Sequence, residues 1–499
     1  MSEMVLEKNQ NLPKGWIPCI LDQIAILIRG VTYEKKDTTN DLKKNHVPIL
    51  RGNNINSNLI LEDLVYVPKS YVKPEQYLKK FDIIITMSSG SKHLVGKAAQ
   101  LLEERNLSFG TFCGCIRPLK GIDEKFLGYF FQSDLYRKTV SNLSLGVNIN
   151  NLRREHIEKL DFLLPPLNEQ KRIVSKIDEL FSKMDFSKQV LEKTKILLKQ
   201  YSQSLLKSAF EGKLTEKWRE DNKDNLEPAS ALLEKTRLEK NNQKFTNPEL
   251  KCDKLYHIPK TWIWVSLEQI CSKINDGTHF SPPNSVNGDV PYVTAKNIRP
   301  NKIDLTNITY ISKKIHQDIY SRCNPEKGDV LYTKDGTVGY SAVNELDFEF
   351  SLLSSVALLK PMKNTIDPYF LSHYLNSPVN FYRIIGKMTG TALRRIILER
   401  IKEIPIPLAP LIEQKRIVSK IDEGLSLIDK NEKVVDLSLL TIGMMKKSIL
   451  KHAFEGKLVP QDPNDEPAEI LLEKIKQEKE SQIQKIIKDK SVPKRRRSS

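Results

Sequence analysis

The sequence predicts an α+β protein with a pseudo-two-fold internal repeat, in which two strand-rich domains are separated by a pair of long antiparallel coiled-coil helices. Three observations support this fold class. The stretch Glu169-Gln-Lys-Arg-Ile-Val-Ser-Lys-Ile-Asp-Glu179 returns unchanged at 413–423. The segment Ala-Phe-Glu-Gly-Lys-Leu occurs at 209–214 and again, equally spaced from the first repeat, at 453–458. The residues between these segments show helical apolar periodicity, and a long helix tolerates no insertions because they would rotate its faces.

The repeat divides the chain into consecutive segments. In chain order these are an N-terminal extension (1–12), a first strand-rich domain (13–163), a first long helix (164–214), a helix and linker (215–257), a second strand-rich domain (258–407), a second long helix (408–458), a C-terminal helix (459–490) and a basic tail (491–499).

Matching segments predict the same scaffold in both strand-rich domains. Each domain opens on a Leu/Ile-Pro-Lys-x-Trp motif ending at Trp16 or Trp262, and we interpret each Trp as a core anchor. The runs 81–86 and 328–333 are apolar and bounded by turn residues, as buried strands are. Polar, glycine-containing loops follow both runs and differ in sequence. This pattern indicates one scaffold with two specificities.

Both long helices carry apolar residues at the 3.5-residue period of a coiled coil, which runs through Tyr201 to Leu205 in the first helix and through Met445 to Ile449 in the second. The alternative is two separate helices, each packed on its own domain. After each rod, a Glu-Pro-Ala sequence at 227 or 466 predicts a further helix start. The residues predicted to form the helix packing are Ile173, Ile177, Leu180, Met184, Leu198, Leu205, Ile417, Ile421, Ile428, Val435, Ile442 and Ile449.

The charge balance indicates a polyanionic partner. The 499 residues carry a formal net charge of +17, which favours nucleic acid over an anionic membrane, although a lysine-rich background composition is the plain alternative. The six cysteines show no zinc-like spacing and are typical of reduced thiols. No apolar run is long enough for a membrane span, so we expect a soluble, cytoplasmic protein without a membrane partner.

The sequence offers only near misses for catalytic motifs. Gly90-Ser-Lys-His-Leu-Val-Gly-Lys-Ala98 has the wrong glycine spacing for a phosphate loop, and Ala98 stands where a hydroxyl must bind magnesium. Asp367-Pro-Tyr369 lacks the second Pro of the adenine methyltransferase loop, and we interpret it as a helix start. The histidines form no spaced cluster. We therefore expect no catalytic residue, cofactor-binding residue or metal ligand in this chain.

Taken together, these motifs resemble the specificity (S) subunit of type I restriction-modification enzymes. The resemblance runs from about Leu12 to about Lys490, and the doubled Glu-Gln-Lys-Arg-Ile-Val helix is its most specific part. It implies that each strand-rich domain is a target recognition domain reading one half of a split double-stranded DNA site. It also implies that the coiled coil spaces the two halves and docks two methyltransferase (M) subunits, and that two restriction (R) subunits complete the nuclease.

The resemblance further implies that this subunit is not itself catalytic. S-adenosylmethionine belongs to the M subunits, and ATP and magnesium belong to the R subunits. Because the loops of the two domains differ, we expect two different half-sites and hence an asymmetric bipartite target for adenine methylation and restriction.

Base reading needs polar side chains on loops that enter the major groove, whereas Lys and Arg bind phosphates without reading sequence. The polar repeat loops and the arginine pairs before each rod supply such groups. For each residue the alternative is a turn residue or a solvated charge. The candidate DNA-binding residues are Arg51, Asn53, Asn54, Ser89, Ser91, Lys92, His93, Arg153, Arg154, Thr294, Lys296, Asn297, Lys334, Asp335, Thr337, Arg394 and Arg395.

Other functions remain open at this stage. The chain could be the specificity component of a type IIG or type IIB-like assembly, or an orphan S subunit that only redirects methylation. A different class is a coiled-coil adaptor whose domains bind proteins, which predicts no salt-sensitive DNA binding. An enzyme with an unrecognised site is the remaining alternative.

Overall fold

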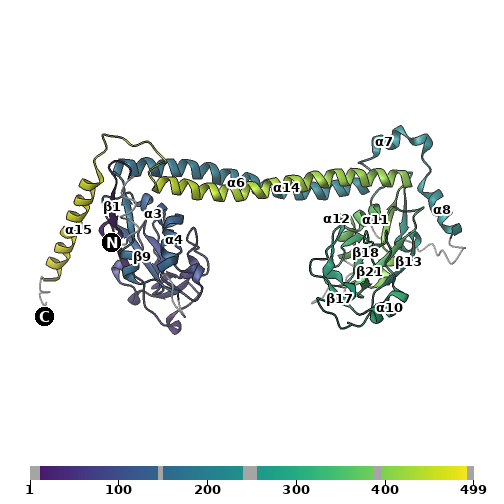
Figure 1. Cartoon of the computed structure of the whole chain (residues 1–499), viewed down its shortest axis with the longest axis horizontal. Helices are drawn as coiled ribbons and strands as arrows, with labels where there is room; N and C mark the ends of the chain where they lie inside the picture. Colours follow the sequence, from purple (N-terminus) through teal and green to yellow (C-terminus); the bar gives the residue numbers. More distant parts are fainter. Residues whose placement is uncertain (1–11, 144–149, 240–254, 386–394, 492–499) are drawn as a thin grey trace. The chain divides into compact units, whose positions relative to one another are not determined.

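The computed structural model describes residues 12–143, 150–239, 255–385 and 395–491. The chain divides into two compact units, one formed by 1–191 with 437–499 and the other by 192–436. Each unit contains one strand-rich domain and part of each of the two long helices, α6 (Leu167–Phe210) and α14 (Leu411–Phe454) (Figure 1). The elements of the units are described separately below.

The first strand-rich domain is built on a four-stranded antiparallel sheet in the order β2-β9-β5-β7. A three-stranded sheet, β4-β3-β8, pairs β3 in parallel with β8. Two short antiparallel pairs, β1-β11 and β6-β10, complete the strands. The bounds are β1 (Ile17–Ile20), β2 (Ala25–Arg29), β3 (His46–Leu50), β4 (Val65–Pro68), β5 (Ile83–Thr86), β6 (Ser88–Ser89), β7 (Ala98–Gln100), β8 (Ser108–Phe109), β9 (Cys113–Pro118), β10 (Asn150–Asn151) and β11 (Asp161–Leu164), with helices α2 (Leu21–Ile24), α3 (Glu124–Gln132), α4 (Asp134–Leu143) and α5 (Arg154–Glu158).

The second domain repeats this plan. Its sheets have the orders β13-β21-β18-β19, β17-β14-β20 and β12-β22, and β15-β16 forms an extra hairpin. The bounds are β12 (Ile263–Ser266), β13 (Cys271–Asp276), β14 (Val290–Val293), β15 (Ile298–Arg299), β16 (Lys302–Ile303), β17 (Thr309–Ile311), β18 (Val330–Thr333), β19 (Ser341–Val343), β20 (Ser351–Leu352), β21 (Val356–Pro361) and β22 (Pro405–Leu408), with helices α9 (Leu267–Ile270), α10 (Lys313–Arg322), α11 (Pro368–Leu375), α12 (Pro378–Ile385) and α13 (Leu398–Lys402).

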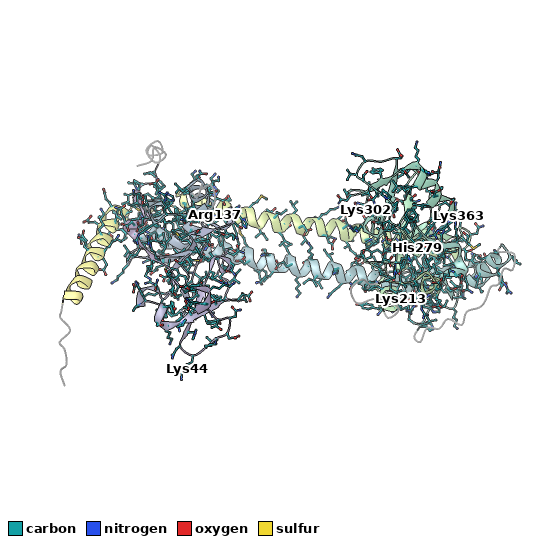
Figure 2. The ribbon with its side chains drawn as sticks, turned by 90° about the horizontal axis from the view of Figure 1, so that it is seen from below. Lys44, Arg137, Lys213, His279, Lys302 and Lys363 are labelled. Carbon is teal, nitrogen blue, oxygen red and sulfur yellow. The ribbon has the colours of Figure 1, made fainter. Side chains whose placement is uncertain are left out.

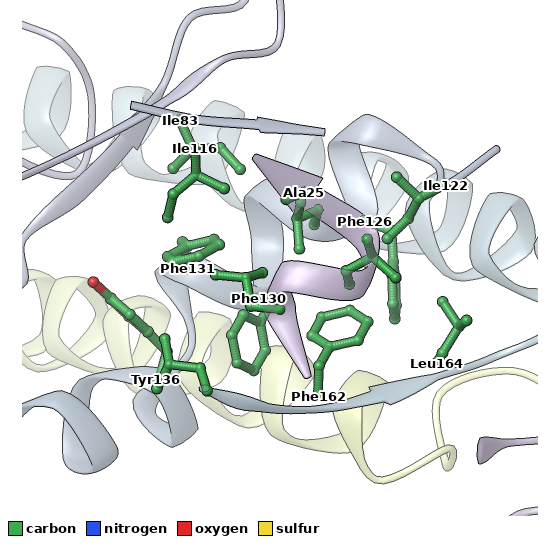
Figure 3. Close-up of a cluster of buried hydrophobic side chains, with 14 of the residues drawn as sticks. Ala25, Ile83, Ile116, Ile122, Phe126, Phe130, Phe131, Tyr136, Phe162 and Leu164 are labelled. Atoms are coloured by element: carbon green, nitrogen blue, oxygen red, sulfur yellow. The ribbon is translucent and has the colours of Figure 1, made fainter. Parts of the chain in front are cut away.

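Aromatic rings fill the core of the first domain. Phe130 packs edge-on against Phe162 with ring centroids 4.9 Å apart, and Phe131 packs against Tyr136 at 4.7 Å (Figure 3). The two tryptophans of the opening motifs, Trp16 and Trp262, are 5% and 3% exposed. The prediction that both are core anchors is therefore confirmed, and burial of such large side chains is a major part of the stability of each domain.

Each long helix begins on one strand-rich domain and ends on the other. Ile173 of α6 lies in the core of the first domain, whereas Phe210 at its end packs against Phe370 of the second, 5.3 Å between centroids. Phe454 at the end of α14 packs against Phe126 of the first domain at 5.1 Å. The alternative of two independent helices is thereby excluded.

A glycine ends each long helix in a left-handed conformation beside the proline that opens a domain. A Cβ atom on Gly212 (φ +75°) would lie 2.4 Å from Pro259, and one on Gly456 (φ +68°) would lie 2.3 Å from Pro13. Both the positive φ and the close approach require glycine. The Gly of the repeated Ala-Phe-Glu-Gly-Lys-Leu segment therefore joins a rod to a domain.

Within each unit the helix segments run antiparallel. Asp185 of α6 pairs with Lys446 of α14 in the first unit, with a 2.6 Å Nζ–Oδ1 distance. Lys195 pairs with Asp436 in the second unit at 2.7 Å. The predicted packing residues are buried or half-buried: Ile173, Ile177, Met184, Leu205, Ile417, Ile421, Ile428 and Val435 are buried, and Leu180, Leu198, Ile442 and Ile449 are half-buried.

The extension of the heptad pattern to Tyr201 and Met445 was wrong, because their side chains are 54% and 49% exposed. They occupy equivalent places in the two repeats. The pattern resumes four residues further on, where Leu205 is buried against Gly424 of α14 and Ile449 is half-buried, so each mismatch is local. Leu206, next to Leu205, lies in the core of the second domain.

A shorter helix follows each rod, as the Glu-Pro-Ala sequences predict: α8 (Ala229–Glu239) and α15 (Ala468–Ser491), the former preceded by α7 (Glu216–Asp221). Leu471 and Ile475 of α15 are buried in the core of the first domain. Lys479 donates to the carbonyl of Asp22 in α2 at 2.6 Å. Among the helices described, none combines the length and the apolar character needed to cross a membrane.

Candidate nucleic-acid interface

Four loop segments of the first domain converge beside the main sheet. Val31, just after β2, donates its N–H to Phe109 at 2.8 Å. Met87, just after β5, donates to Phe112 at 2.8 Å and accepts from Leu152 at 2.7 Å. We call the resulting set, residues 29–33, 87–93, 110–112 and 150–154, loop cluster 1.

The second domain brings the equivalent segments together. Thr278 donates its N–H to Leu352 at 2.9 Å, Lys334 donates to Ser355 at 2.9 Å, and Ile396 donates to Lys334 at 2.9 Å. We call residues 276–280, 334–339, 353–355 and 395–396 loop cluster 2. The same backbone connections therefore occur in both domains.

A glycine marks the same crossing in each cluster. A Cβ atom on Gly30 would lie 2.1 Å from the carbonyl oxygen of Gly110, and one on Gly277 would lie 1.9 Å from that of Leu352. No other residue type permits two backbones to approach this closely. These glycines hold the converging segments together and leave neighbouring positions free to vary.

The candidates of the first domain differ in accessibility. Asn53, Ser91 and His93 are exposed, Ser89 is half-buried in β6, and Arg153 is exposed immediately before α5. Arg154 is held by an ion pair with Glu158. Arg51 donates from Nη2 to the carbonyl of Asp63 at 3.0 Å. The side chain of Lys92 lies outside the described part of the structure.

The candidates of the second domain divide similarly. Lys296 and Thr337 are exposed, and Thr294 caps a short 3₁₀ turn by accepting from the backbone N–H of Lys296. Asp335 accepts from Arg395 Nε at 2.8 Å, which joins two segments of loop cluster 2. Arg394 lies outside the described residues.

Three predicted residues are buried and serve the fold. Asn54 is 1% exposed, and its Nδ2 donates to the carbonyls of Ile60 at 3.1 Å and Glu62 at 3.0 Å. Asn297, the equivalent residue, is 5% exposed and donates to Asp304. A polar group that is buried and hydrogen-bonded holds its turn and is not available to DNA. We no longer propose Asn54 and Asn297 as DNA contacts.

Lys334 is the third buried candidate. Its side chain is 7% exposed, and Nζ lies 3.0 Å from Oδ2 of Asp276, which is also buried. Direct contact with a phosphate would break this pair and remove the buried cation that lies closest to a buried carboxylate. The role of Lys334 is therefore to hold Asp276.

Sequence reasoning missed exposed side chains in both clusters. Arg29 and Phe112 project from loop cluster 1, with Phe112 65% exposed. His279 lies on the surface of loop cluster 2 (Figure 2), and Arg322 reaches the cluster from the end of α10. A residue-by-residue alignment of the two repeats on Gly30 and Gly277 would have identified Arg29 and His279. Arg322 gives no such signal because it is distant in sequence.

The repeated Glu-Gln of the long helices forms a structural joint. Glu413 is fully buried and accepts from Thr215 Oγ1 at 2.7 Å and from Trp262 Nε1 at 2.9 Å. Burial raises the pKa of Glu413, and the hydrogen bonds from Thr215 and Trp262 act in the opposite direction. Gln414 bridges the backbone of Asp367 and Ala409. The repeated Glu-Gln pair therefore joins helix to domain, and both of its side chains are buried.

A second surface feature lies on the helix pair. In the first unit, a shallow groove of about 550 Å³ between α6 and α14 is lined by residues that include Phe186, Val190 and Leu437. The exposed fractions of these three side chains are 69%, 47% and 63%. Exposed apolar residues that lie together on one surface more often mark a site that binds another protein than a surface that stays in contact with solvent.

One buried set has the composition of a hydrolase triad. His316 approaches Ser351 Oγ at 3.0 Å through Nδ1 and Glu349 Oε2 at 3.2 Å through Nε2. Ser351 is fully buried, so no substrate reaches its hydroxyl, and the two ring nitrogens are reversed relative to a Ser-His-acid triad. These residues join α10 to β20. In the described ranges no group of three or more His, Cys, Asp or Glu side chains has metal-site geometry.

The fold and the paired loop clusters define a protein with two equivalent strand-rich domains and two long helices. The chain belongs to the family of the type I restriction modification DNA specificity domain, whose model matches residues 13–195 and 259–434. It is 31% identical to the type I restriction enzyme EcoKI specificity subunit of Escherichia coli K12, across 94% of this chain and 96% of that protein. It is 30% identical to the StySPI specificity subunit of Salmonella potsdam, with the same coverage of 94% and 96%.

Solved structures share the fold. The HsdS subunit from Thermoanaerobacter tengcongensis matches with a TM-score of 0.53 at 17% identity, over 90% of this chain and 99% of that one. A chain from a structural study of type I R-M complex assembly and conformational transition matches with a TM-score of 0.62 at 18% identity, over 90% of this chain and 100% of that one.

Proposed function

We propose that this chain is the DNA sequence-recognition subunit of a type I restriction-modification enzyme and that it reads an asymmetric bipartite target. The observation that carries the proposal is the pair of loop clusters, which share backbone connections but present different side chains. Base reading depends on the donors and acceptors that loops present, so two different clusters fit two different half-sites. The net charge of +17 supplies the sequence-independent attraction to phosphate.

The long helices suit the role of a spacer between half-sites. Each has 44 residues. At about 1.5 Å per residue such a helix is roughly 66 Å long. A rigid spacer favours a target with two short specified parts and a fixed unspecified gap.

Exposed apolar side chains at repeat-related positions of the two long helices fit two copies of one partner. In the first unit, Val190 of α6 is exposed together with Leu440 and Met445 of α14. In the second unit the repeat-related residues, Val434 of α14 with Ile196 and Tyr201 of α6, are exposed in the same way. Apolar side chains exposed at repeat-related positions of both helices support docking of two methyltransferase subunits, with two restriction subunits completing the enzyme.

In this proposal the chain is not catalytic. The methyltransferase subunits hold S-adenosylmethionine, the restriction subunits hold ATP and magnesium, and this chain directs adenine methylation and restriction to the target. A cytoplasmic location follows from that role.

Genome-wide mapping of methylated adenines tests the function. Cells expressing the chain with its methyltransferase are compared with cells in which this gene carries a frameshift. We expect a two-part motif with a fixed gap only with the intact gene, and replacement of residues 13–160 should change one half of that motif. Identical methylation without the gene would contradict the proposal and favour the protein-adaptor function. Methylation without restriction would identify a methylation-only subunit, and a single fused methylase-nuclease partner would indicate a type IIG or IIB-like system.

A further inference from the structure

A buried carboxylate surrounded by basic side chains lies at the end of β13. Asp276 is 3% exposed, and Lys334, also buried, approaches its Oδ2 at 3.0 Å. Arg322 Nη2 and His279 Nε2 approach its Oδ1 at 3.3 and 3.1 Å. The negative charge of Asp276 faces two positive charges, one on Lys334 and one on Arg322, and His279 is not included in this count. The group is therefore net positive and attracts an anionic or acceptor-rich ligand.

The two outer side chains of this group are anchored at one end only. Arg322 donates from Nη2 to the carbonyls of Gly277 at 2.6 Å and Asp276 at 3.1 Å. The exposed fraction of its side chain is 56%, and Nε and Nη1 bond to nothing in the part of the chain that the structure describes. His279 is 62% exposed and turns only Nε2 toward Asp276.

An arginine held in this way is already ordered for a ligand. Fixing the side chain before binding removes most of the entropy cost of using its remaining N–H groups. The planar guanidinium allows Nη2 to be held while Nη1 still donates in a fixed direction, which a lysine ammonium does not.

The first domain has different residues at the equivalent places. In the sheet register, Arg29 lies opposite Gly114 as Asp276 lies opposite Ala357, and Met87 takes the place of Lys334. A group needed for the scaffold would recur, as the pairs Asp82–Arg117 in the first domain and Asp329–Lys360 in the second do. The restriction of this group to one domain indicates a role in specificity.

We propose that Arg322, with His279 beside it, reads a guanine in the half-site of the second domain, and that Asp276 positions both side chains. The inference rests on the proposed function. Guanine presents two acceptors, O6 and N7, in the major groove, and Arg is the side chain that most often reads them. A phosphate contact needs only charge, and the hydrogen bonds that orient Arg322 would contribute little to it.

The test uses the full chain in complex with its methyltransferase and a library of DNA duplexes randomised in the half-site of the second domain. That half-site is identified beforehand by the domain replacement. Wild type is compared with Arg322→Lys and Arg322→Ala, and Arg400→Ala serves as a matched control because Arg400 is exposed and forms an ion pair with Glu403. We expect both Arg322 variants to lose the preference for guanine at one position by about 10-fold or more, with every other position unchanged.

Two outcomes overturn the guanine contact while leaving the function intact. Arg322→Lys could behave as wild type while Arg322→Ala weakens all sequences alike and lowers the salt dependence, which is the behaviour of a phosphate contact. Alternatively, neither variant could change the preference. A wild-type complex without any two-part preference would instead refute the proposed function itself.

The positioning role of Asp276 has its own variant. Asp276→Asn keeps the side-chain shape but removes the charge that holds Arg322, and we expect it to relax the same DNA position as Arg322→Lys. Relaxation at a different position would contradict the positioning role. Thermal unfolding checks that the variant is folded, and the Arg322→Lys result decides the proposal if it is not.

Discussion

The two strand-rich domains share their interiors and differ at one end. Asp82 pairs with Arg117 in the first domain, 2.6 Å between Oδ2 and Nη2, and Asp329 pairs with Lys360 at the equivalent place in the second at 2.8 Å. These buried pairs link equivalent strands. The loop clusters, by contrast, present Arg29 and Phe112 in one domain and His279 and Arg322 in the other.

The comparison separates two kinds of constraint. A buried residue touches many neighbours, so a change there affects packing over the whole domain. A loop residue beside one of the glycines where two backbone segments cross has few neighbours. It can therefore be substituted without loss of the fold. The two domains therefore share the buried residues that build the scaffold and differ in the side chains that their loop clusters expose. The following predictions test that division.

The largest expected effect concerns the C-terminal ends of the long helices, each of which packs into the core of one strand-rich domain. Phe454→Ala removes a ring that packs against Phe126, and we expect it to lower the free energy of unfolding of the first domain by about 3–5 kcal/mol. Phe210→Ala should do the same to the second domain. Hydrogen exchange resolved by peptide distinguishes the two. Phe186→Ala, which changes an exposed ring, is the control, and an equal effect of both core variants on both domains would break the comparison.

The next effect concerns the apolar side chains exposed at repeat-related positions of the long helices. Leu440→Ser and Ile196→Ser change equivalent exposed residues, and each should weaken one methyltransferase site by about 1–2 kcal/mol, or roughly tenfold. Native mass spectrometry should show one tightly held copy for each single variant and none for the double variant. Lys199→Ala is the polar control on the same helix. Loss of both copies from one substitution would mean that the two sites are not independent.

Because the two long helices are equivalent, lengthening both by the same amount should lengthen the gap between the two half-sites. Four residues inserted into both helices, about one turn, add roughly 6 Å. At roughly 3.4 Å per base pair the unspecified gap should grow by about two base pairs. Methylation mapping measures the gap. An insertion in α6 alone should shift its contacts with α14 out of register and destabilise the protein, and an unchanged gap after the double insertion would refute the spacer role.

The smallest effect concerns the helix joints. Because burial raises the folded-state pKa of Glu413 above its ordinary value of 4.5, the folded state binds a proton more readily than the unfolded state does. This contribution to stability is fully present below pH 4.5 and is lost as pH rises through the raised pKa. Glu413→Gln should flatten that pH dependence for the second domain. Denaturant unfolding from pH 4 to 7 measures it, with Glu423→Gln as the exposed control, and equal curves for Glu413→Gln and wild type would contradict the assignment.

The sequence by itself determined the repeat, the strand-rich class of both domains, the long helices and the buried tryptophans. Each of these rests on a local or periodic signal. An apolar period needs only the neighbouring residues of one helix, and a doubled motif needs no knowledge of what it contacts. The role of the doubled Glu-Gln motif did not follow from its recurrence, because Glu413 meets Thr215 and Trp262 only in the folded chain.

The site depended on tertiary structure. Asn53 and Asn54 are adjacent and chemically alike. Asn53 is exposed, whereas Asn54 is buried and donates its side-chain amide to backbone carbonyls several residues further along the chain. Arg322 joins Asp276 from a different element, and no sequence pattern records that approach. Distant segments that converge on a loop decide which of its polar residues face solvent. Neighbouring residues of a loop point in different directions, so one amide is buried while the next is exposed.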